Sequence, residues 1–347
     1  MSSRSLLDLS FGDLLDQLAT LGQPGFRAQQ IWQAVYKDLE TSYDRMTTLP
    51  AALRAELSKS LPILPIEEAA AASSADGRTR KILGRLTDGE TIETVAMAYD
   101  RRHTVCVSTQ VGCPMDCKLC ATGRSGFMRN LSSGEIVGQV LQAARWFADR
   151  GTRLSNVVYM GMGEPFANYD ATLASVRRLN DPRGFHLGAR SFTLSTVGVV
   201  PAIDRLAGEG LQVNLAVSLH AADDELRSQL VPANRRYPLR ALISACRRYV
   251  EATHRRVTFE IALIDGVNDS DHDAQRTAAL LKGLLCHVNV IPFNRVEGLA
   301  WRGSSKERVQ AFCAVLEEAR IPATIRYSRG ADIQAACGQL RARNRDA

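Results

Sequence analysis

Three cysteines, Cys113, Cys117 and Cys120, follow one another with the spacing C-x3-C-x2-C. Three thiolates in one loop can bind a metal ion or an iron–sulfur cluster. A structural zinc site uses four protein ligands, and no fourth cysteine or histidine follows at the usual spacing. In a four-iron cluster held by three cysteines, one iron stays open to bind a substrate and deliver an electron to it. The spacing therefore favours such a cluster, with a zinc site completed by a distant residue as the alternative.

Five further cysteines bring the total to eight. The first residues, MSSRSLLDLSFGDLLDQ, place acidic side chains within an apolar stretch and offer no small-residue cleavage site, unlike a secretory signal. We therefore expect a reducing cytoplasm, where clustered cysteines are ligands or reactive thiols rather than disulfides. Cys106 and Cys337 lie outside the cysteine motif. The remaining three, Cys246, Cys286 and Cys313, stand among apolar residues and are predicted to be buried packing residues.

The composition is that of a globular chain: 347 residues, 45% hydrophobic and 23% charged, enough for one large domain and one small one. No apolar run approaches the roughly 18 residues of a membrane span, which excludes a membrane-embedded enzyme. The net charge is +6, and residues 235–256 hold seven arginines against one acidic residue, Glu251. This stretch predicts a surface for a phosphate backbone, with a solvated helix face as the alternative.

The N-terminal part of the chain has a helical pattern. Ile31, Trp32, Val35 and Tyr36 share one helix face, and we assign residues 1–65 to a small helical accessory domain.

Residues 66–100 are expected to connect this domain to the rest. The run EEAAAASSADG at 67–77 is interpreted as a linker. Residues 80–86 and 90–99 flank an Asp-Gly pair, which predicts a β-hairpin.

Strand and helix patterns alternate through residues 101–347, the expected core domain. The predicted strands are 103–109, 154–160, 191–196, 211–219, 256–264, 287–293 and 323–327. Ser132 and Glu135 predict a capping box at the start of one helix, and Pro201 suits the first turn of another. The alternation predicts an α/β fold with a parallel sheet, forming a full or partial (β/α) barrel. Functional side chains should then follow the carboxyl ends of the strands.

The sequence from about Gln30 to Leu340 resembles the RlmN/Cfr family of radical S-adenosylmethionine (SAM) RNA adenine methyltransferases, and RlmN most of all. The segments that carry the resemblance occur in the family's order: CVSTQVGCPMDCKLCATGRSGFMRNLSSGEIVGQV, VVYMGMGEPFANY, LSTVGVVP, AVSLHAADDELRSQLVPANR, NVIPFN and GADIQAACGQL. One position departs from the pattern. Leu119 precedes the last cysteine of the motif, where radical SAM enzymes usually carry an aromatic residue, so an apolar contact replaces ring stacking on the adenine of SAM.

The resemblance implies a partial (β/α)6 radical SAM barrel with the helical domain and the hairpin as extensions. It implies a [4Fe-4S] cluster on Cys113, Cys117 and Cys120, and SAM as the second cofactor. The residues expected to bind SAM are Gly163, Glu164, Ser195, Ser218, Leu219, His220 and Asn294. From the residues alone, each of these also has an ordinary structural interpretation. Ser195 would be a turn residue, His220 a helix cap and Asn294 a loop residue that forms hydrogen bonds.

The resemblance also implies roles for three catalytic residues. Cys337 accepts a methyl group from one SAM, and a 5′-deoxyadenosyl radical from a second SAM removes a hydrogen atom from it. The resulting methylene radical adds to an adenine carbon. Glu93 then removes the ring proton, and Cys106 attacks the sulfur of Cys337, which releases the methylated base and leaves a disulfide. Without the resemblance, Glu93 is a solvent-facing strand glutamate. The thiolate of Cys337 requires an electropositive pocket, for which Arg329 is near in sequence.

The implied substrates are an adenosine in the peptidyl-transferase centre of 23S rRNA and the adenosine 3′ of the tRNA anticodon, each unstacked to expose the reacting carbon. The helical domain, the arginine stretch and the basic tail at 341–345 are expected to contact RNA. A flavodoxin or ferredoxin of low potential would donate electrons, and the enzyme is expected to be a monomer. A C8-directed, Cfr-like enzyme conferring antibiotic resistance and a non-catalytic iron–sulfur RNA-binding or redox-sensing protein remain alternatives, although the full N-terminal domain favours the RlmN form.

Overall fold

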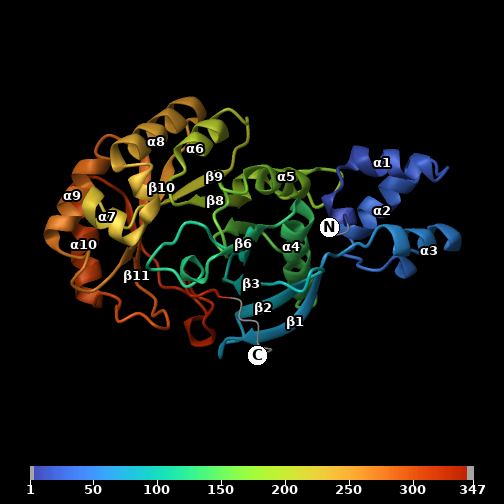
Figure 1. Cartoon of the computed structure of the whole chain (residues 1–347), viewed down its shortest axis with the longest axis horizontal. Helices are drawn as coiled ribbons and strands as arrows, with labels where there is room; N and C mark the ends of the chain where they lie inside the picture. Colours follow the sequence, from blue (N-terminus) through green and yellow to red (C-terminus); the bar gives the residue numbers. More distant parts are fainter. Residues whose placement is uncertain (1–3, 342–347) are drawn as a thin grey trace.

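The computed structural model describes residues 4–341, whose strands form one large mixed sheet and one small hairpin. The strand order of the large sheet is β1-β2-β3-β4-β7-β8-β9-β10-β11-β12. Figure 1 shows the N-terminal helices at one end of the molecule and helices α8 to α10 at the other. No helix within residues 4–341 is both long enough and apolar enough to cross a membrane.

The N-terminal domain consists of three α-helices, and Trp32 of the second is buried with its ring edge-on to Phe11 of the first. The helices are α1 (Phe11–Thr20), α2 (Phe26–Tyr36) and α3 (Ala51–Ser60). Ile31, Trp32, Val35 and Tyr36 are buried, which confirms the predicted helix face. A short 3-10 turn, η1 (Leu6–Asp8), ties this domain to the barrel, because Asp8 accepts a hydrogen bond from the N–H of Gly134 (2.7 Å) in the first turn of α4.

Strands β1 (Ile66–Ser73), β2 (Thr79–Leu86) and β3 (Thr91–Ala98) form an antiparallel extension of the barrel sheet. The predicted hairpin is confirmed as β2 and β3. The interpretation of residues 67–77 as a linker is wrong, because residues 67–73 belong to β1 and pair with β2. Alanine and glutamate have low strand propensity, and the exposed edge of β2 overrides it by offering hydrogen-bond partners.

The parallel part of the sheet confirms the predicted partial barrel. Its strands are β4 (His103–Cys106), β7 (Asn156–Tyr159), β8 (Phe192–Thr196), β9 (Asn214–Ser218), β10 (Val257–Leu263), β11 (Cys286–Pro292) and β12 (Ala323–Ile325). The helices between them are α4 (Ser133–Ala148), α5 (Tyr169–Asn180), α6 (Val200–Ala207), α7 (Asp224–Leu230), α8 (Leu239–Thr253), α9 (Asp271–Leu281) and α10 (Lys306–Glu318). The predicted capping box begins α4, and Pro201 lies in the first turn of α6.

A second, short hairpin was not predicted from the sequence. It pairs β5 (Gln110–Gly112) with β6 (Phe127–Asn130) and holds the cysteine motif between its strands. Short 3-10 turns complete the described structure: η2 (Tyr43–Arg45), η3 (Gly123–Ser125), η4 (Ala189–Ser191), η5 (Pro232–Arg235) and η6 (Ala331–Ile333).

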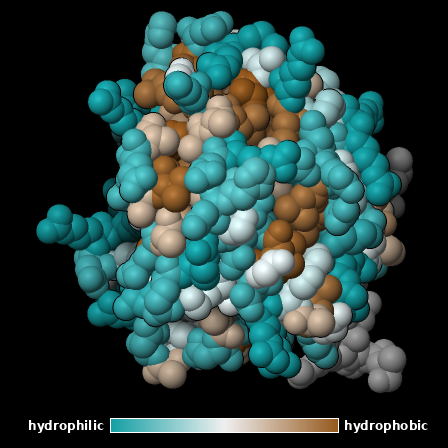
Figure 2. All heavy atoms as spheres, turned by 90° about the vertical axis from the view of Figure 1, so that its left-hand side faces the viewer, coloured by the Kyte–Doolittle hydropathy of each residue, from teal (hydrophilic) through white to brown (hydrophobic). Residues whose placement is uncertain are grey.

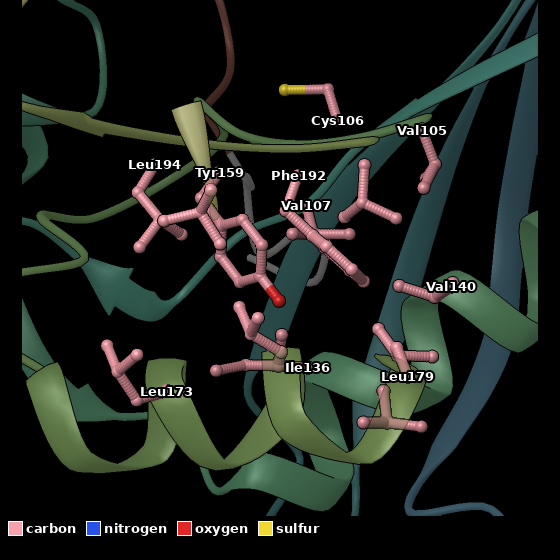
Figure 3. Packing of buried hydrophobic residues seen from close by; sticks show 14 of the residues in the cluster. Val105, Cys106, Val107, Ile136, Val140, Tyr159, Leu173, Leu179, Phe192 and Leu194 are labelled. Carbon is pink, nitrogen blue, oxygen red and sulfur yellow. The ribbon is translucent and has the colours of Figure 1, made fainter. Parts of the chain in front are cut away.

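The core lies between the parallel strands and the helices outside them. Figure 3 shows Val105, Val107 and Phe192 on the side of the sheet that faces α4 and α5, whereas the side chain of Cys106 points the other way. Alternation along β4 and the residue after it therefore sends Val105 and Val107 into the core and Cys106 toward the barrel interior. Cys246, Cys286 and Cys313 are buried, as predicted.

The arginines of residues 235–256 do not form one free surface. Arg248 pairs with Asp204 (2.8 Å), and Arg255 donates to the carbonyl oxygen of Val213 (2.9 Å). Helix α8 runs from the carboxyl end of β9 to the amino end of β10, so it spreads these arginines along the barrel. The arginines are therefore divided between the two ends of α8, and their contact with a phosphate backbone stays a prediction. Figure 2 shows that this side of the molecule is largely hydrophilic, with hydrophobic atoms in separate patches. The basic tail lies outside the described residues beyond Arg341.

Arg227 is the buried side chain that ties the strand ends together. Its guanidinium donates to the carbonyl oxygens of Val197 (2.6 Å), Ser218 (3.0 Å) and Leu219 (3.0 Å), which follow or end β8 and β9. Burial lowers the pKa of Arg227 to about 10, which still leaves it charged at neutral pH.

Arg227→Met should reduce the free energy of unfolding by about 3 kcal/mol, because several buried acceptors lose a charged donor. Urea denaturation measures this change. Arg236→Met, an exposed neighbour, is the control and should change stability by less than about 0.5 kcal/mol. Equal effects of the two substitutions would contradict the role of Arg227.

Candidate active site

The cysteine motif is shaped by a close backbone approach at the end of β5. Gly112 has a φ of +74°, and an added Cβ there would lie 2.0 Å from the carbonyl oxygen of Gly126. The N–H of Cys113 donates to this same oxygen (2.8 Å), which closes the loop. Cys113, Cys117 and Cys120 thereby line one cavity of about 160 Å³ beside the carboxyl ends of the parallel strands.

The protein around the cysteine motif disfavours thiolates when no metal is bound. Burial raises the pKa of Cys113 to about 12 and that of Cys117 well above its ordinary value, and the neighbouring thiols add to both effects. In the part of the chain that the structure describes, no group of three or more His, Cys, Asp and Glu side chains forms a ready-made metal site. Since metals and clusters bind thiolates, binding here must displace protons.

Glu164 presents a buried carboxylate to the same cavity. Its two oxygens accept hydrogen bonds from the N–H groups of Phe166 (3.0 Å) and Val197 (2.9 Å). Burial raises the pKa of Glu164 to about 7, and these hydrogen bonds oppose the shift. Gly163 permits this arrangement, because its φ is +99° and an added Cβ would lie 2.6 Å from the side chain of Gln110. A bound ammonium group would restore the favourable environment that the carboxylate lacks.

Most of the predicted SAM-binding residues meet in this cavity. The lining includes Gly163, Glu164, Ser195, Ser218, His220 and Asn294, which come from four strand ends. Leu219 differs: its side chain is fully buried outside the lining, and its backbone bonds to Arg227 and Glu260. Its structural role is therefore to hold the end of β9.

His220 and Asn294 have defined hydrogen-bonding states. Nδ1 of His220 accepts from the N–H of Ala262 (3.1 Å), and burial lowers the pKa of His220 to about 3. The ring is neutral at pH 7, so Nε2 carries its proton. Asn294 donates to the hydroxyl of Ser328 (2.9 Å) and to the carbonyl oxygen of Cys337 (3.1 Å). Asn294 therefore connects the end of β11 to the segment that carries Cys337.

Cys106 and Cys337 are both free thiols that lie close together, although they come from opposite ends of the core domain in the sequence. Cys106 is buried at the end of β4, and Cys337 is exposed at the wall of the 160 Å³ cavity. Burial raises the pKa of Cys106, and the nearby Cys337 thiol adds to this shift. The protein packed around the thiol of Cys337 raises its pKa, whereas Arg326 acts in the opposite direction.

Arg326, rather than Arg329, supplies the positive charge near Cys106 and Cys337. Arg329 is engaged elsewhere, with Asp76 (3.7 Å). Arg326 interacts electrostatically with Cys106 and Cys337 and pairs with Glu260 (3.4 Å), a buried carboxylate that lines the cavity. Sequence reasoning missed this pair. The available signal was a single charged residue within the apolar strand VTFEIAL.

Glu93 lies in a second, larger cavity of about 760 Å³. Glu93 is buried, so the alternative interpretation as a solvent-facing strand glutamate is wrong. One carboxylate oxygen pairs with Nζ of Lys81 (3.0 Å), and the other accepts from the N–H of Arg341 (2.8 Å). Its backbone is held too, because the hydroxyl of Ser108 donates to the Glu93 carbonyl oxygen (2.6 Å).

Residues 330–341, the wall segment, contribute residues to the linings of both cavities. Cys337 and Gly338 line the smaller cavity, whereas Gln334, Gln339 and Arg341 line the larger one. Cys337 therefore stands at the boundary between a cavity with the thiols of the cysteine motif and a cavity with Glu93.

Comparison with known proteins decides the family. Residues 4–63 match the model of the ribosomal RNA large subunit methyltransferase N-terminal domain, and residues 107–278 match that of the radical SAM superfamily. A probable dual-specificity RNA methyltransferase RlmN from Chloroflexus aurantiacus is 49% identical over 99% of this chain and 94% of its own. The counterpart from Moorella thermoacetica is 48% identical over 96% of each chain. The chain belongs to the RlmN family.

A crystal structure of a similar protein supports the radical SAM fold of this chain. The radical SAM methyltransferase from Sphaerobacter thermophilus is 54% identical, and the two structures superpose with a TM-score of 0.97 over 98% of this chain and 100% of that one.

The radical SAM superfamily implies a [4Fe-4S] cluster and SAM, and the residues of the smaller cavity fit both. Three thiols share one wall, and no protein residue of the motif supplies a fourth. Gly123 keeps the loop compact, since an added Cβ would lie 2.8 Å from the backbone of Cys117. A carboxylate and a neutral histidine face the same space, which suits the amino and polar groups of SAM.

Glu164→Gln should weaken SAM binding by about 10- to 100-fold, because a hydrogen bond between charged groups is removed. Affinity of the unsubstituted protein should rise from pH 6 to pH 7, as Glu164 ionises while the α-amino group stays protonated. The variant should lack this rise. Equilibrium binding of SAM to the anaerobically reconstituted enzyme tests both expectations, and an unchanged affinity and slope would contradict them.

Proposed function

We propose that this protein is a radical SAM methyltransferase that methylates C2 of an adenosine in 23S rRNA and of the adenosine 3′ of the tRNA anticodon. The observation that carries the proposal is the position of Cys337 between the two cavities, with Glu93 and Cys106 nearby. The RlmN relatives are named dual-specificity RNA methyltransferases, which supports the choice of two RNA substrates. The C2 position follows from the resemblance to RlmN.

Cys113, Cys117 and Cys120 would hold the cluster, and Gly163, Glu164, Ser195, Ser218, His220 and Asn294 would hold SAM. When bound, cluster and SAM supply the one-electron chemistry that creates a carbon radical and takes back one electron after the radical has added to the ring. Glu164 binds the ammonium group of SAM, and the neutral His220 offers Nε2–H as a donor. A low-potential flavodoxin or ferredoxin would supply the electrons.

Cys337 carries the methyl group between cofactor and substrate. Its thiolate attacks the methyl carbon of SAM, which forms an S–CH3 bond and releases S-adenosylhomocysteine. Arg326 favours the thiolate needed for this attack. From the wall segment, the same sulfur can then present its carbon to an adenosine in the larger cavity. A volume of about 760 Å³ lies within the usual range of roughly 300–1,000 Å³ for small-molecule pockets, so an unstacked nucleoside fits.

Glu93 and Cys106 release the product. Glu93 accepts the proton from C2, and the electron pair of the C–H bond returns to the ring. Cys106 then attacks the sulfur of Cys337: an S–S bond forms, the S–CH2 bond breaks, and its electron pair stays on the carbon, which takes a proton to become the methyl group. A thiol reductant must reduce this disulfide before the next turnover.

Three exposed guanidinium groups around the larger cavity, those of Arg124, Arg295 and Arg341, are suited to the RNA backbone. The double variant Arg124→Ala, Arg295→Ala should weaken binding of an rRNA fragment. It should also reduce the salt dependence of binding by about one unit of slope for each phosphate that these arginines neutralise. Binding isotherms at several salt concentrations measure both effects.

Arg256→Ala, an exposed arginine at the amino end of β10, is the matched control for this double variant and should bind the rRNA fragment normally. Weaker binding by Arg256→Ala than by the double variant would place the RNA on the other end of the barrel.

Mass spectrometry of nucleosides tests the proposed function. Fragments of rRNA and tRNA incubated with reconstituted enzyme, SAM and reductant should yield 2-methyladenosine, and Cys337→Ala should yield none. 8-Methyladenosine would instead identify a Cfr-like enzyme. Absence of any methylated adenosine, despite release of 5′-deoxyadenosine, would overturn the assigned substrate. If Cys337→Ala then also left RNA binding unchanged, the result would favour a non-catalytic protein.

A further inference from the structure

Lys81 forms an ion pair with Glu93 that none of the mechanistic steps above uses. The two residues are on adjacent antiparallel strands: Lys81 lies opposite Val95, and Glu93 precedes Val95 by two positions. Residues two apart on a strand share a face, so Lys81 and Glu93 are diagonal neighbours on one face of the sheet. The distance between Nζ of Lys81 and Oε1 of Glu93 is 3.0 Å, with side-chain exposures of 18% and 7%.

The same face carries Cys106. Val95 lies opposite Lys81 on one side and opposite Cys106 on the other, so one row across β2, β3 and β4 holds Lys81, Val95 and Cys106. Ala72 of β1 continues this row beyond Lys81. Its small side chain leaves the ammonium group accessible from the larger cavity, which both Lys81 and Ala72 line.

The ion pair also contacts the segment that carries Cys337, once on each side of this cysteine. Nζ of Lys81 donates to the carbonyl oxygen of Gln334 (3.3 Å), and Oε2 of Glu93 accepts from the N–H of Arg341 (2.8 Å). Lys81 therefore contacts both the carboxylate and the wall segment. With both oxygens of Glu93 engaged, the carboxylate has one defined orientation relative to the sulfur of Cys337.

We propose that Lys81 is a positioning residue for the proton transfer, one that holds the carboxylate of Glu93 toward the ring carbon bonded through CH2 to Cys337. This inference rests on the proposed function. The proton of C2 moves to Glu93, and Lys81 takes no part in the transfer itself. Misplacement of a catalytic group by about 1 Å can cost about 100-fold in rate, so removal of Lys81 acts on this step more than on others.

The test uses full-length reconstituted enzyme and a labelled rRNA fragment in single turnover. Lys81→Met should slow the decay of the covalent protein–RNA adduct by about 10- to 100-fold, and the adduct should accumulate on denaturing gels. Formation of 5′-deoxyadenosine and methylation of Cys337 should stay within about two-fold of the unsubstituted enzyme, because Lys81 does not line the smaller cavity. Lys81→Arg should restore most of the decay rate, since it keeps the positive charge.

Two comparisons separate the possible failures. Arg80→Met removes an ion pair with Glu68 from the opposite face of β2 and should not change adduct decay. Equal slowing by Arg80→Met, or equal loss of every step with Lys81→Met, would reduce Lys81 to a structural role and overturn the inference.

Glu93→Gln should slow adduct decay by about 100-fold or more. If this variant traps the adduct and Lys81→Met does not, only the inference fails; if Glu93→Gln releases product at the normal rate, the proposed role of Glu93 itself fails.

Discussion

The register of β3 against β4 is the constraint on which the catalytic arrangement depends. Val95 lies opposite Cys106, which places Glu93, Val95 and Cys106 on one face of the sheet. A slip of one residue would turn Glu93 to the opposite face, away from the larger cavity. The antiparallel extension β1–β3 is thus more than an attachment to the barrel, because it brings a carboxylate and a lysine to a site that the parallel strands alone do not reach.

The parallel strands supply the other half of the site through a shared edge. Their carboxyl ends bring Glu164, Ser195, Ser218 and Asn294 to one cavity, although these residues are far apart in the sequence. Arg227 stabilises this edge by donating hydrogen bonds to carbonyl oxygens near two strand ends. The wall segment contributes residues to both this cavity and the one with Glu93, and in the proposed mechanism Cys337 carries the carbon between them.

Much of this arrangement was predictable from the sequence. Buried parallel strands give clear apolar runs, and the cysteine spacing, the capping box at Ser132 and the Asp-Gly turn each have a local physical cause. Strand β1 was missed because its alanines and glutamates carry no strand signal, and only pairing with β2 makes them extended. The Arg326–Glu260 pair and the Lys81–Glu93 pair depend on contacts between distant segments. A local pattern marks Glu260 as a lone charge in an apolar strand, but it does not identify the partner of either carboxylate. The distribution of the arginine stretch could not be predicted for the same reason: composition gives the charge, whereas the path of α8 decides where the charge lies.

The central claim is that Cys337 carries the substrate carbon and Cys106 releases it. The most direct measurement is tandem mass spectrometry of the Cys106→Ala variant after reaction with SAM, reductant and an rRNA fragment. The account predicts that adenosine remains linked through a CH2 group to the sulfur of Cys337. Release of methylated adenosine at the normal rate, or a link to a different residue, would contradict it.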